Sequence, residues 1–120
     1  PINVFRGEVK DGRLVLGEDV ILCVKGVEDR KVFVGIRPEG FVLDETGPLR
    51  CSLRAVEVMG RDTSIVFEHP ARVSANLRAI IPSENRPAAA AEALRFTLKP
   101  NKVFLFDHES QERVFFRTEG

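Results

Sequence analysis

The chain is organised around residues 32–41, which read VFVGIRPEGF. The first half alternates branched apolar residues as a buried strand does. Pro38 ends the strand, because proline has no N–H to donate to a neighbouring strand. Arg37 and Glu39 flank the proline, which fixes its own φ and biases the preceding residue toward an extended backbone. The stretch therefore predicts a strand that ends in a stiff bend with two opposite charges. Without another role, these two charges would simply be solvated.

Turn signals before and after this bend divide the chain into short strands. Asp11-Gly12 joins residues 7–10 to residues 13–16, and this dipeptide tolerates the positive φ angles of a type I′ hairpin. Residues 49–59 form the longest strand pattern, but its apolar set shifts by one position near Ala55-Val56. Because a period of two cannot place both sets on one face, we predict a β-bulge or sharp bend there.

The second half of the chain predicts further strands and one helix. Strand patterns occupy residues 63–68, 71–81, 96–98, 103–107 and 114–116. Pro87 and the alanines that lead to Leu94 predict a short helix, because proline suits the first helical turn and alanine has the highest helix propensity. Many short strands punctuated by Gly, Pro and Asp indicate an all-β fold, a small barrel or paired small barrels.

Composition limits the classes of function. The 120 residues fit one domain, or two small lobes that share a core. Hydrophobic residues make up 43%, charged residues 30%, and the formal net charge is +0, which argues against a protein that tracks nucleic-acid phosphates. No apolar run approaches the roughly 18 residues that span a bilayer, and no signal peptide is evident, so we expect a cytosolic chain. Because the chain starts at Pro1 and its one methionine is Met59, we also expect a fragment of a longer protein.

The motifs that catalysis and metal binding need are missing from the sequence. No Gly-x-x-x-x-Gly-Lys-Ser/Thr run is present to cradle nucleotide phosphates, so we expect no ATP hydrolysis here. Cys23 and Cys51 lie in strand-like runs without CxxC spacing, which favours two buried thiols over a disulfide or a zinc site. His69 and His108 have no third ligand nearby. We expect no catalytic residue, no metal and no cofactor in this chain.

Three stretches resemble the motifs of one family. Gly35–Glu39 reads GIRPE, the signature of the C-terminal regulatory domain of ATP-binding subunits of sugar-type ABC importers, the group that includes the maltose importer's ATPase. Val56–Thr63 is similar to the VExxGxDT pattern that follows GIRPE in that domain. Leu105–Asp107 resembles the start of its closing LFDxxTGxR motif, although Ser110-Gln111 stands here in place of Thr-Gly. Without that glycine, a turn with positive φ costs more.

The resemblance implies a fold and a set of partners. It implies OB-like barrels of the molybdate-binding-protein superfamily (a MOP-like, TOBE-type domain), as one unit over residues 1–120 or as two interleaved lobes. The domain would be cut from a longer ATPase subunit, whose missing N-terminal part would hold ATP and Mg²⁺. Its expected partners are a second copy, the transmembrane permease subunits and a regulatory protein, at the inner face of the cell membrane, with no nucleic acid. In that family two regulatory domains meet across a two-fold axis, a contact that uses the same patch on both copies.

The resemblance also identifies candidate residues for the motif and the interface. The matching motif positions are Gly35, Ile36, Arg37, Pro38, Glu39, Glu57, Gly60, Asp62, Thr63, Phe106 and Asp107. We expect Arg37, Glu39 and Asp107 to make polar contacts that order the bend or the subunit contact, and the apolar members to pack.

Two other functions stay open at this point. OB-type barrels also bind single-stranded nucleic acid, and members of the superfamily bind oxyanions such as molybdate, although fold alone does not establish function. The nine phenylalanines mostly fall on apolar alternation and are expected in the core. Phe115 and Phe116 cannot both face inward on a regular strand, so one of them must be exposed or lie at an interface.

Overall fold

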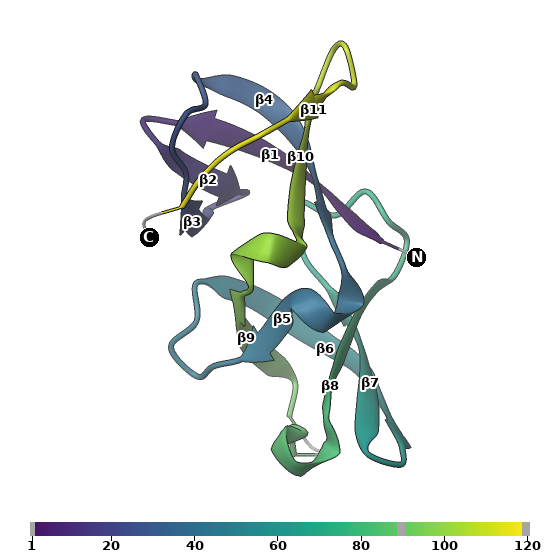
Figure 1. Ribbon diagram of the computed structural model, residues 1–120. Helices are drawn as coiled ribbons and strands as arrows, with labels where there is room; N and C mark the ends of the chain where they lie inside the picture. The colour runs from purple at the N-terminus through teal and green to yellow at the C-terminus, as the bar shows by residue number, and fades with distance from the viewer. Residues whose placement is uncertain (1, 89–90, 119–120) are drawn as a thin grey trace.

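The computed structural model describes residues 2–88 and 91–118, and it confirms an all-β chain built from two antiparallel sheets (Figure 1). The six-stranded sheet contains, in spatial order, β11 (Arg113–Val114), β10 (Val103–Asp107), β4 (Arg30–Ile36), β1 (Asn3–Lys10), β2 (Arg13–Leu16) and β3 (Asp19–Cys23). The five-stranded sheet contains β5 (Phe41–Leu43), β9 (Ala93–Leu98), β6 (Leu49–Met59), β7 (Asp62–Glu68) and β8 (Leu77–Pro82). Three 3₁₀ turns connect strands: η1 (Pro38–Gly40), η2 (Ser83–Asn85) and η3 (Pro100–Lys102).

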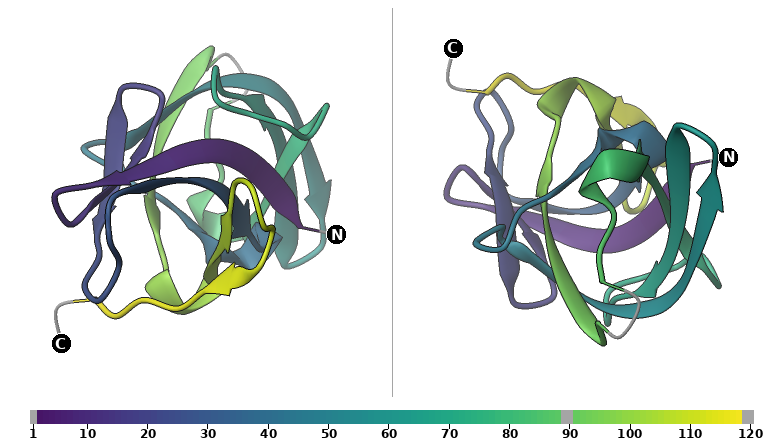
Figure 2. Two further views of the ribbon diagram at one scale, coloured as in Figure 1. Left: turned by 90° about the horizontal axis from the view of Figure 1, so that it is seen from above. Right: turned by 90° about the horizontal axis from the view of Figure 1, so that it is seen from below.

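Each sheet curls around its own part of the core. The six-stranded sheet forms the upper half of Figure 1 and the five-stranded sheet the lower half, and the strands encircle the long axis when seen from above or below (Figure 2). Lys25 and Arg117 exchange backbone hydrogen bonds of 2.7 and 3.0 Å, which join the two ends of the six-stranded sheet. We call the two halves the upper and the lower barrel.

The chain passes between the barrels twice, and the two passages are bonded to each other. β4 leads through η1 to β5, and β9 leads through η3 back to β10. The N–H of Arg37 donates to the carbonyl of Lys102 at 3.1 Å, and the N–H of Lys99 donates to the carbonyl of Gly40 at 2.8 Å. The proline bend therefore lies at the junction of the two barrels.

The buried apolar side chains form one continuous cluster through both barrels. In the upper barrel, Val32, Val34 and Ile36 of β4 are fully buried, as their alternation predicted. In the lower barrel, Phe67 and Phe96 lie 5.0 Å apart between ring centroids, and each is 5.2 Å from the ring of Phe41. Aromatic pairs at these separations stabilise a core beyond their buried area.

Several local predictions are confirmed. Asp11 and Gly12 have φ angles of 50° and 75°, and they join β1 to β2 as a hairpin. The pairing of β6 with β7 shifts register between Leu53 and Ala55, next to the predicted bulge. Phe115 is 73% exposed, whereas Phe116 packs against the core.

The predicted helix at Pro87–Leu94 is wrong in the part that the structure describes. Residues 86–88 and 91–92 have no regular structure and β9 begins at Ala93, while residues 89–90 lie outside the described residues. Leu94 and Phe96 instead alternate inward on β9, which pairs with β5 and β6. A helix this short is marginal alone, so pairing in the sheet outweighs the helix propensity of alanine.

Two further predictions need correction. The predicted strand 71–81 is too long at its start, because β8 begins at Leu77 and runs to Pro82, while Ala71 and Val73 bond to β1 in an irregular connection. Cys51 is buried, and burial raises the pKa of its thiol, but Cys23 is exposed, because it is the last residue of β3. No helix within residues 2–88 and 91–118 is long and apolar enough to cross a membrane.

Candidate functional site

The proline bend packs closely on the second passage between the barrels. The N–H of Gly40 donates to the carbonyl of Arg37 at 2.9 Å and closes η1 after Pro38. Gly40 is buried, and a β-carbon there would lie 2.6 Å from the β-carbon of Lys102, so only glycine lets η1 approach η3 this closely. Arg37 and Glu39 stay exposed on the two sides of the proline.

Glu39 and Asp62 line one groove, although they come from two different motifs. The groove lies between β5 and β8, the two edge strands of the lower barrel, and encloses about 560 Å³. Lys99 also lines it, as do Val42 and Ile80 on the opposing edges. The structure therefore places a groove with apolar walls and both signs of charge next to the bend.

The hairpin between β6 and β7 is held at its tip by η2. Gly60, with φ of 72°, is the first of two loop residues, the position where II′ hairpins use glycine. The hydroxyl of Ser83 donates to the carbonyl of Gly60 at 2.8 Å, and the N–H of Ser83 donates to the carbonyl of Arg61 at 2.8 Å. The Thr63 and Ser83 hydroxyls are 2.7 Å apart. The second motif therefore builds a fixed hairpin tip.

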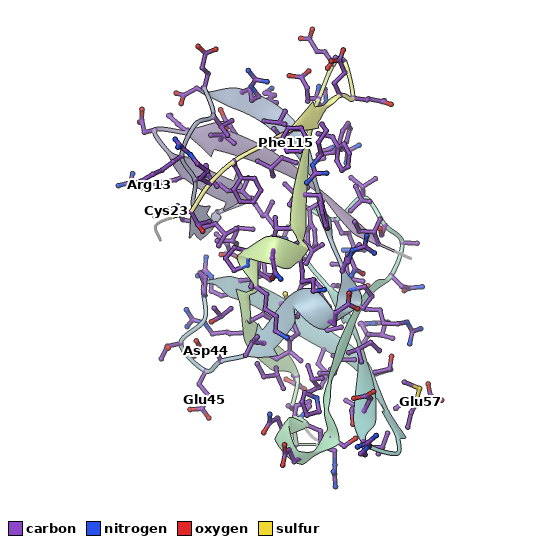
Figure 3. All side chains as sticks on the ribbon, viewed as in Figure 1. Arg13, Cys23, Asp44, Glu45, Glu57 and Phe115 are labelled. Atoms are coloured by element: carbon purple, nitrogen blue, oxygen red, sulfur yellow. The ribbon has the colours of Figure 1, made fainter. Side chains whose placement is uncertain are left out.

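The same hairpin exposes apolar side chains beside its charges. Val58 is 53% exposed and Met59 is 48% exposed, on the residues just before Gly60. Glu57 points away from the body of the lower barrel (Figure 3). Successive residues of a strand face opposite sides, so Met59 shares a face with its pairing partner Asp62, and Val58 lies on the other face. We call Met59 and the groove at Glu39 and Asp62 the hairpin–groove surface.

Asp107 orders the turn between β10 and β11. Its carboxylate accepts hydrogen bonds from the N–H of Ser110 at 3.0 Å and the N–H of Glu109 at 2.9 Å, and these bonds lower the pKa of Asp107. A guanidinium nitrogen of Arg30 is 3.5 Å from the same carboxylate. Gln111 takes a φ of 63° in this turn, so it keeps the conformation that the family's glycine would favour.

The motif residues form two separate groups. Glu57, Gly60 and Asp62 lie with Glu39 on the lower barrel, on or beside the hairpin–groove surface. Phe106 and Asp107 lie on β10 in the upper barrel, where Phe106 pairs with Phe33 of β4 and is half-buried. Arg37 and Pro38 stand between the groups at the junction. The predicted interface role of these residues stays a prediction.

A polar cluster that the sequence analysis missed joins the two barrels. Asp19 of β3 is 5% exposed, and one carboxylate oxygen accepts a hydrogen bond from Nε of Arg50 on β6 at 2.8 Å. A second guanidinium nitrogen of Arg50 forms an ion pair with the same oxygen, also at 2.8 Å. The other oxygen accepts from the backbone N–H of Arg50 at 3.0 Å and from Nε2 of His69 at 2.9 Å. Nδ1 of His69 accepts from the N–H of Ala71 at 3.1 Å, so the ring proton is on Nε2.

These contacts set the charge of the Asp19 carboxyl. Burial alone would raise its pKa, but the hydrogen bonds from the Arg50 backbone, from His69 and from the Arg50 guanidinium together lower the pKa below the ordinary value of 3.8. The carboxylate is therefore ionised and satisfied when both barrels are in place. Within the described part of the chain, no three His, Cys, Asp or Glu side chains are placed to hold a metal ion.

Comparison with known proteins finds relatives of this chain among ATP-binding proteins for import and transport. The chain is homologous to part of the ATP-binding subunits of ABC importers for sugars and glycerol phosphates, which confirms the resemblance of its motifs. It is 38% identical over 123 residues to the sulfoquinovosyl glycerol transport ATP-binding protein SmoE of Agrobacterium fabrum, covering 94% of this chain and 33% of that protein. It is 27% identical over 113 residues to the sn-glycerol-3-phosphate import ATP-binding protein UgpC of Ruegeria sp., covering 94% of this chain and 32% of that protein.

A third relative, UgpC of Jannaschia sp., is 29% identical over 116 residues, which cover 95% of this chain and 32% of the relative. The chain thus spans about a third of the length of the curated relatives it matches. No protein-family model matches the chain.

Replacing Asp19 by asparagine should destabilise the protein by about 2–3 kcal/mol at pH 7, because an amide N–H₂ would face the donors of Arg50 and His69. Since the folded-state pKa of Asp19 is lowered, its stabilisation is complete above the unfolded value of 3.8 and is lost as pH falls through the folded pKa. Urea unfolding at pH 7 and at acid pH should show a smaller pH dependence in Asp19→Asn than in wild type. The exposed Glu8→Gln is the control, and equal pH dependence in all three proteins would contradict the assignment.

Replacing Gln111 by glycine should stabilise the protein by about 0.5–1 kcal/mol, because glycine adopts a positive φ without the strain that a side chain meets. The control is Ser110→Gly in the same turn, where φ is not positive. Glycine there adds entropy to the unfolded chain and removes the hydroxyl that accepts from the N–H of Glu112 at 3.2 Å, so it should destabilise the protein. Thermal unfolding should give opposite signs for the two variants. A lower midpoint for Gln111→Gly would show that its side chain stabilises the turn in some other way.

Proposed function

We propose that this chain is the regulatory and dimerisation domain of the ATP-binding subunit of an ABC importer for sugars or related small solutes. The observation that carries the proposal is the match of 94% of the chain to a third of such proteins. The remaining two thirds of the longer protein would then bind ATP and Mg²⁺ and hydrolyse ATP. Permease subunits would hold that protein at the inner face of the membrane.

In this proposal the domain acts mechanically. The Asp19 cluster and the two bonded passages at η1 and η3 tie both barrels into one body. A body that does not bend at its middle can hold two ATPase domains side by side while they open and close. The domain would then add contact area between the two ATP-binding subunits and keep their ATPase domains aligned.

The hairpin–groove surface has the properties that a two-fold contact needs. Such a contact places the same patch of two copies against each other, so the patch must be complementary to itself. Met59 offers apolar area, while Glu39 and Asp62 can pair with Lys99 of the other copy. We therefore place the dimer contact on the lower barrel.

Replacing Met59 by glutamate should raise the dissociation constant of the dimer at least about tenfold, since a buried contact would acquire an unpaired charge. The control is Val73→Glu, which adds the same charge at a residue that is 44% exposed but lies outside this surface. Sedimentation of the full-length protein across concentrations measures both. Equal association of the two variants would remove the hairpin tip from the contact.

Glu39→Ala should also weaken association, whereas Asp107→Ala should leave association unchanged and lower the melting temperature. The carboxylate of Asp107 already accepts two hydrogen bonds from its own turn, but that of Glu39 is exposed in the groove. The same sedimentation series, with thermal unfolding of each variant, separates the two effects. Weaker association in Asp107→Ala alone would move the contact to the upper barrel. Failure of the full-length protein to bind ATP would overturn the proposed function itself.

A further inference from the structure

The upper barrel carries a row of alternating guanidinium and phenyl groups, which the proposed dimer contact does not use. The guanidinium carbon of Arg37 is 5.3 Å from the ring centroid of Phe104, and that of Arg113 is 4.7 Å from the same centroid. Arg113 also lies 4.7 Å from the ring centroid of Phe115, which is 73% exposed. Figure 3 shows Phe115 on the upper half of the molecule, away from the Glu57 hairpin. We call these four residues the Arg–Phe ladder.

The two guanidinium groups of the ladder have no carboxylate partner among residues 2–88 and 91–118. This distinguishes them from Arg30, Arg50 and Arg72, each of which pairs with an acid. A guanidinium that stacks on a ring keeps its N–H edge free, and that edge matches a carboxylate through two parallel hydrogen bonds. The rings also hold the guanidinium groups in place, so less side-chain entropy is lost when an acid binds.

A hollow lies beside the ladder. It encloses about 480 Å³ and is lined by Phe104, Arg113, Phe115, Phe116 and Arg117, among others. Exposed aromatic walls next to free guanidinium groups suit a ligand that brings both an apolar side chain and a carboxylate. Aromatic and arginine side chains are also the residues that most often dominate the binding energy of protein contacts.

We propose that the Arg–Phe ladder and its hollow form a docking surface for an acidic segment of another protein. Carboxylates of that segment pair with Arg37 and Arg113, and an apolar side chain enters the hollow beside the rings. A second copy of this chain does not fit, because a two-fold contact would place the guanidinium groups against one another. A nucleic acid does not fit either, since the net charge of +0 gives no basic excess for phosphates. The inference rests on the ladder and is independent of the proposed function.

The test uses the full-length protein and a fluorescein-labelled peptide in which Glu alternates with Leu and Phe. Fluorescence anisotropy should show binding to wild type, and Arg113→Gln and Phe115→Ser should each weaken it at least about tenfold. Arg6→Gln, which removes an exposed charge elsewhere on the same barrel, is the control and should bind as wild type does. The same peptide with Gln in place of Glu should bind at least tenfold more weakly than the acidic one.

Four results would overturn the proposal: no binding of the acidic peptide to wild type, equal binding of the Gln peptide, equal binding by the ladder variants, or tighter binding of a labelled oligothymidylate. Loss of dimer in Arg113→Gln would also overturn it, by making the ladder a self-contact. The effect of Met59→Glu on association reports the dimer contact alone, so failure of one proposal is distinguishable from failure of the other.

Discussion

The carboxylate of Asp19 is the contact on which the placement of the two barrels depends. It accepts three hydrogen bonds, two from Arg50 and one from His69, and forms an ion pair with the Arg50 guanidinium; both residues belong to the lower barrel. An ion buried without such partners is costly, so a displacement of one barrel against the other leaves a charge unsatisfied. Apolar packing alone would tolerate small shifts of one barrel relative to the other. The cluster therefore favours one relative position of the two halves.

A buried side-chain amide on the N-terminal strand adds to this constraint. The side-chain amide of Asn3 donates to the carbonyls of Ile36 on β4 and Arg78 on β8, both at 2.9 Å, and accepts from the N–H of Arg78 at 2.7 Å. One buried amide thus bonds to both barrels. The proline bend lies at the same junction, where the chain must leave one sheet and enter the other. Pro38 of the GIRPE motif and the adjacent Gly40, which packs closely on Lys102, set the geometry of this crossing.

The parts of the fold that could be predicted depend on neighbours in the sequence. The hairpin at Asp11-Gly12 and the bulge beside Ala55 follow from turn chemistry and from the period of two. The helix predicted at Pro87–Leu94 was wrong because it rested on the helix propensity of alanine alone. The pairing of β9 with β6 involves residues far away in the chain, which a local propensity does not include. The Asp19 cluster joins residues that are 31 and 50 positions apart, and no local pattern reports such a distance. One signal was present: Asp19 shares the inward face of its strand with Ile21, and an inward carboxylate needs a partner.

The proline bend also separates two charges that are only two residues apart in the sequence. Arg37 turns to the ring of Phe104 in the upper barrel, and Glu39 turns to the groove of the lower barrel. The ladder carries one sign of charge, which disfavours contact with itself and suits a foreign acidic partner. The groove carries both signs, which suits a second copy of the same surface. Because Pro38 fixes the backbone between them, one short motif positions a residue on each surface, and the two surfaces keep a constant spacing.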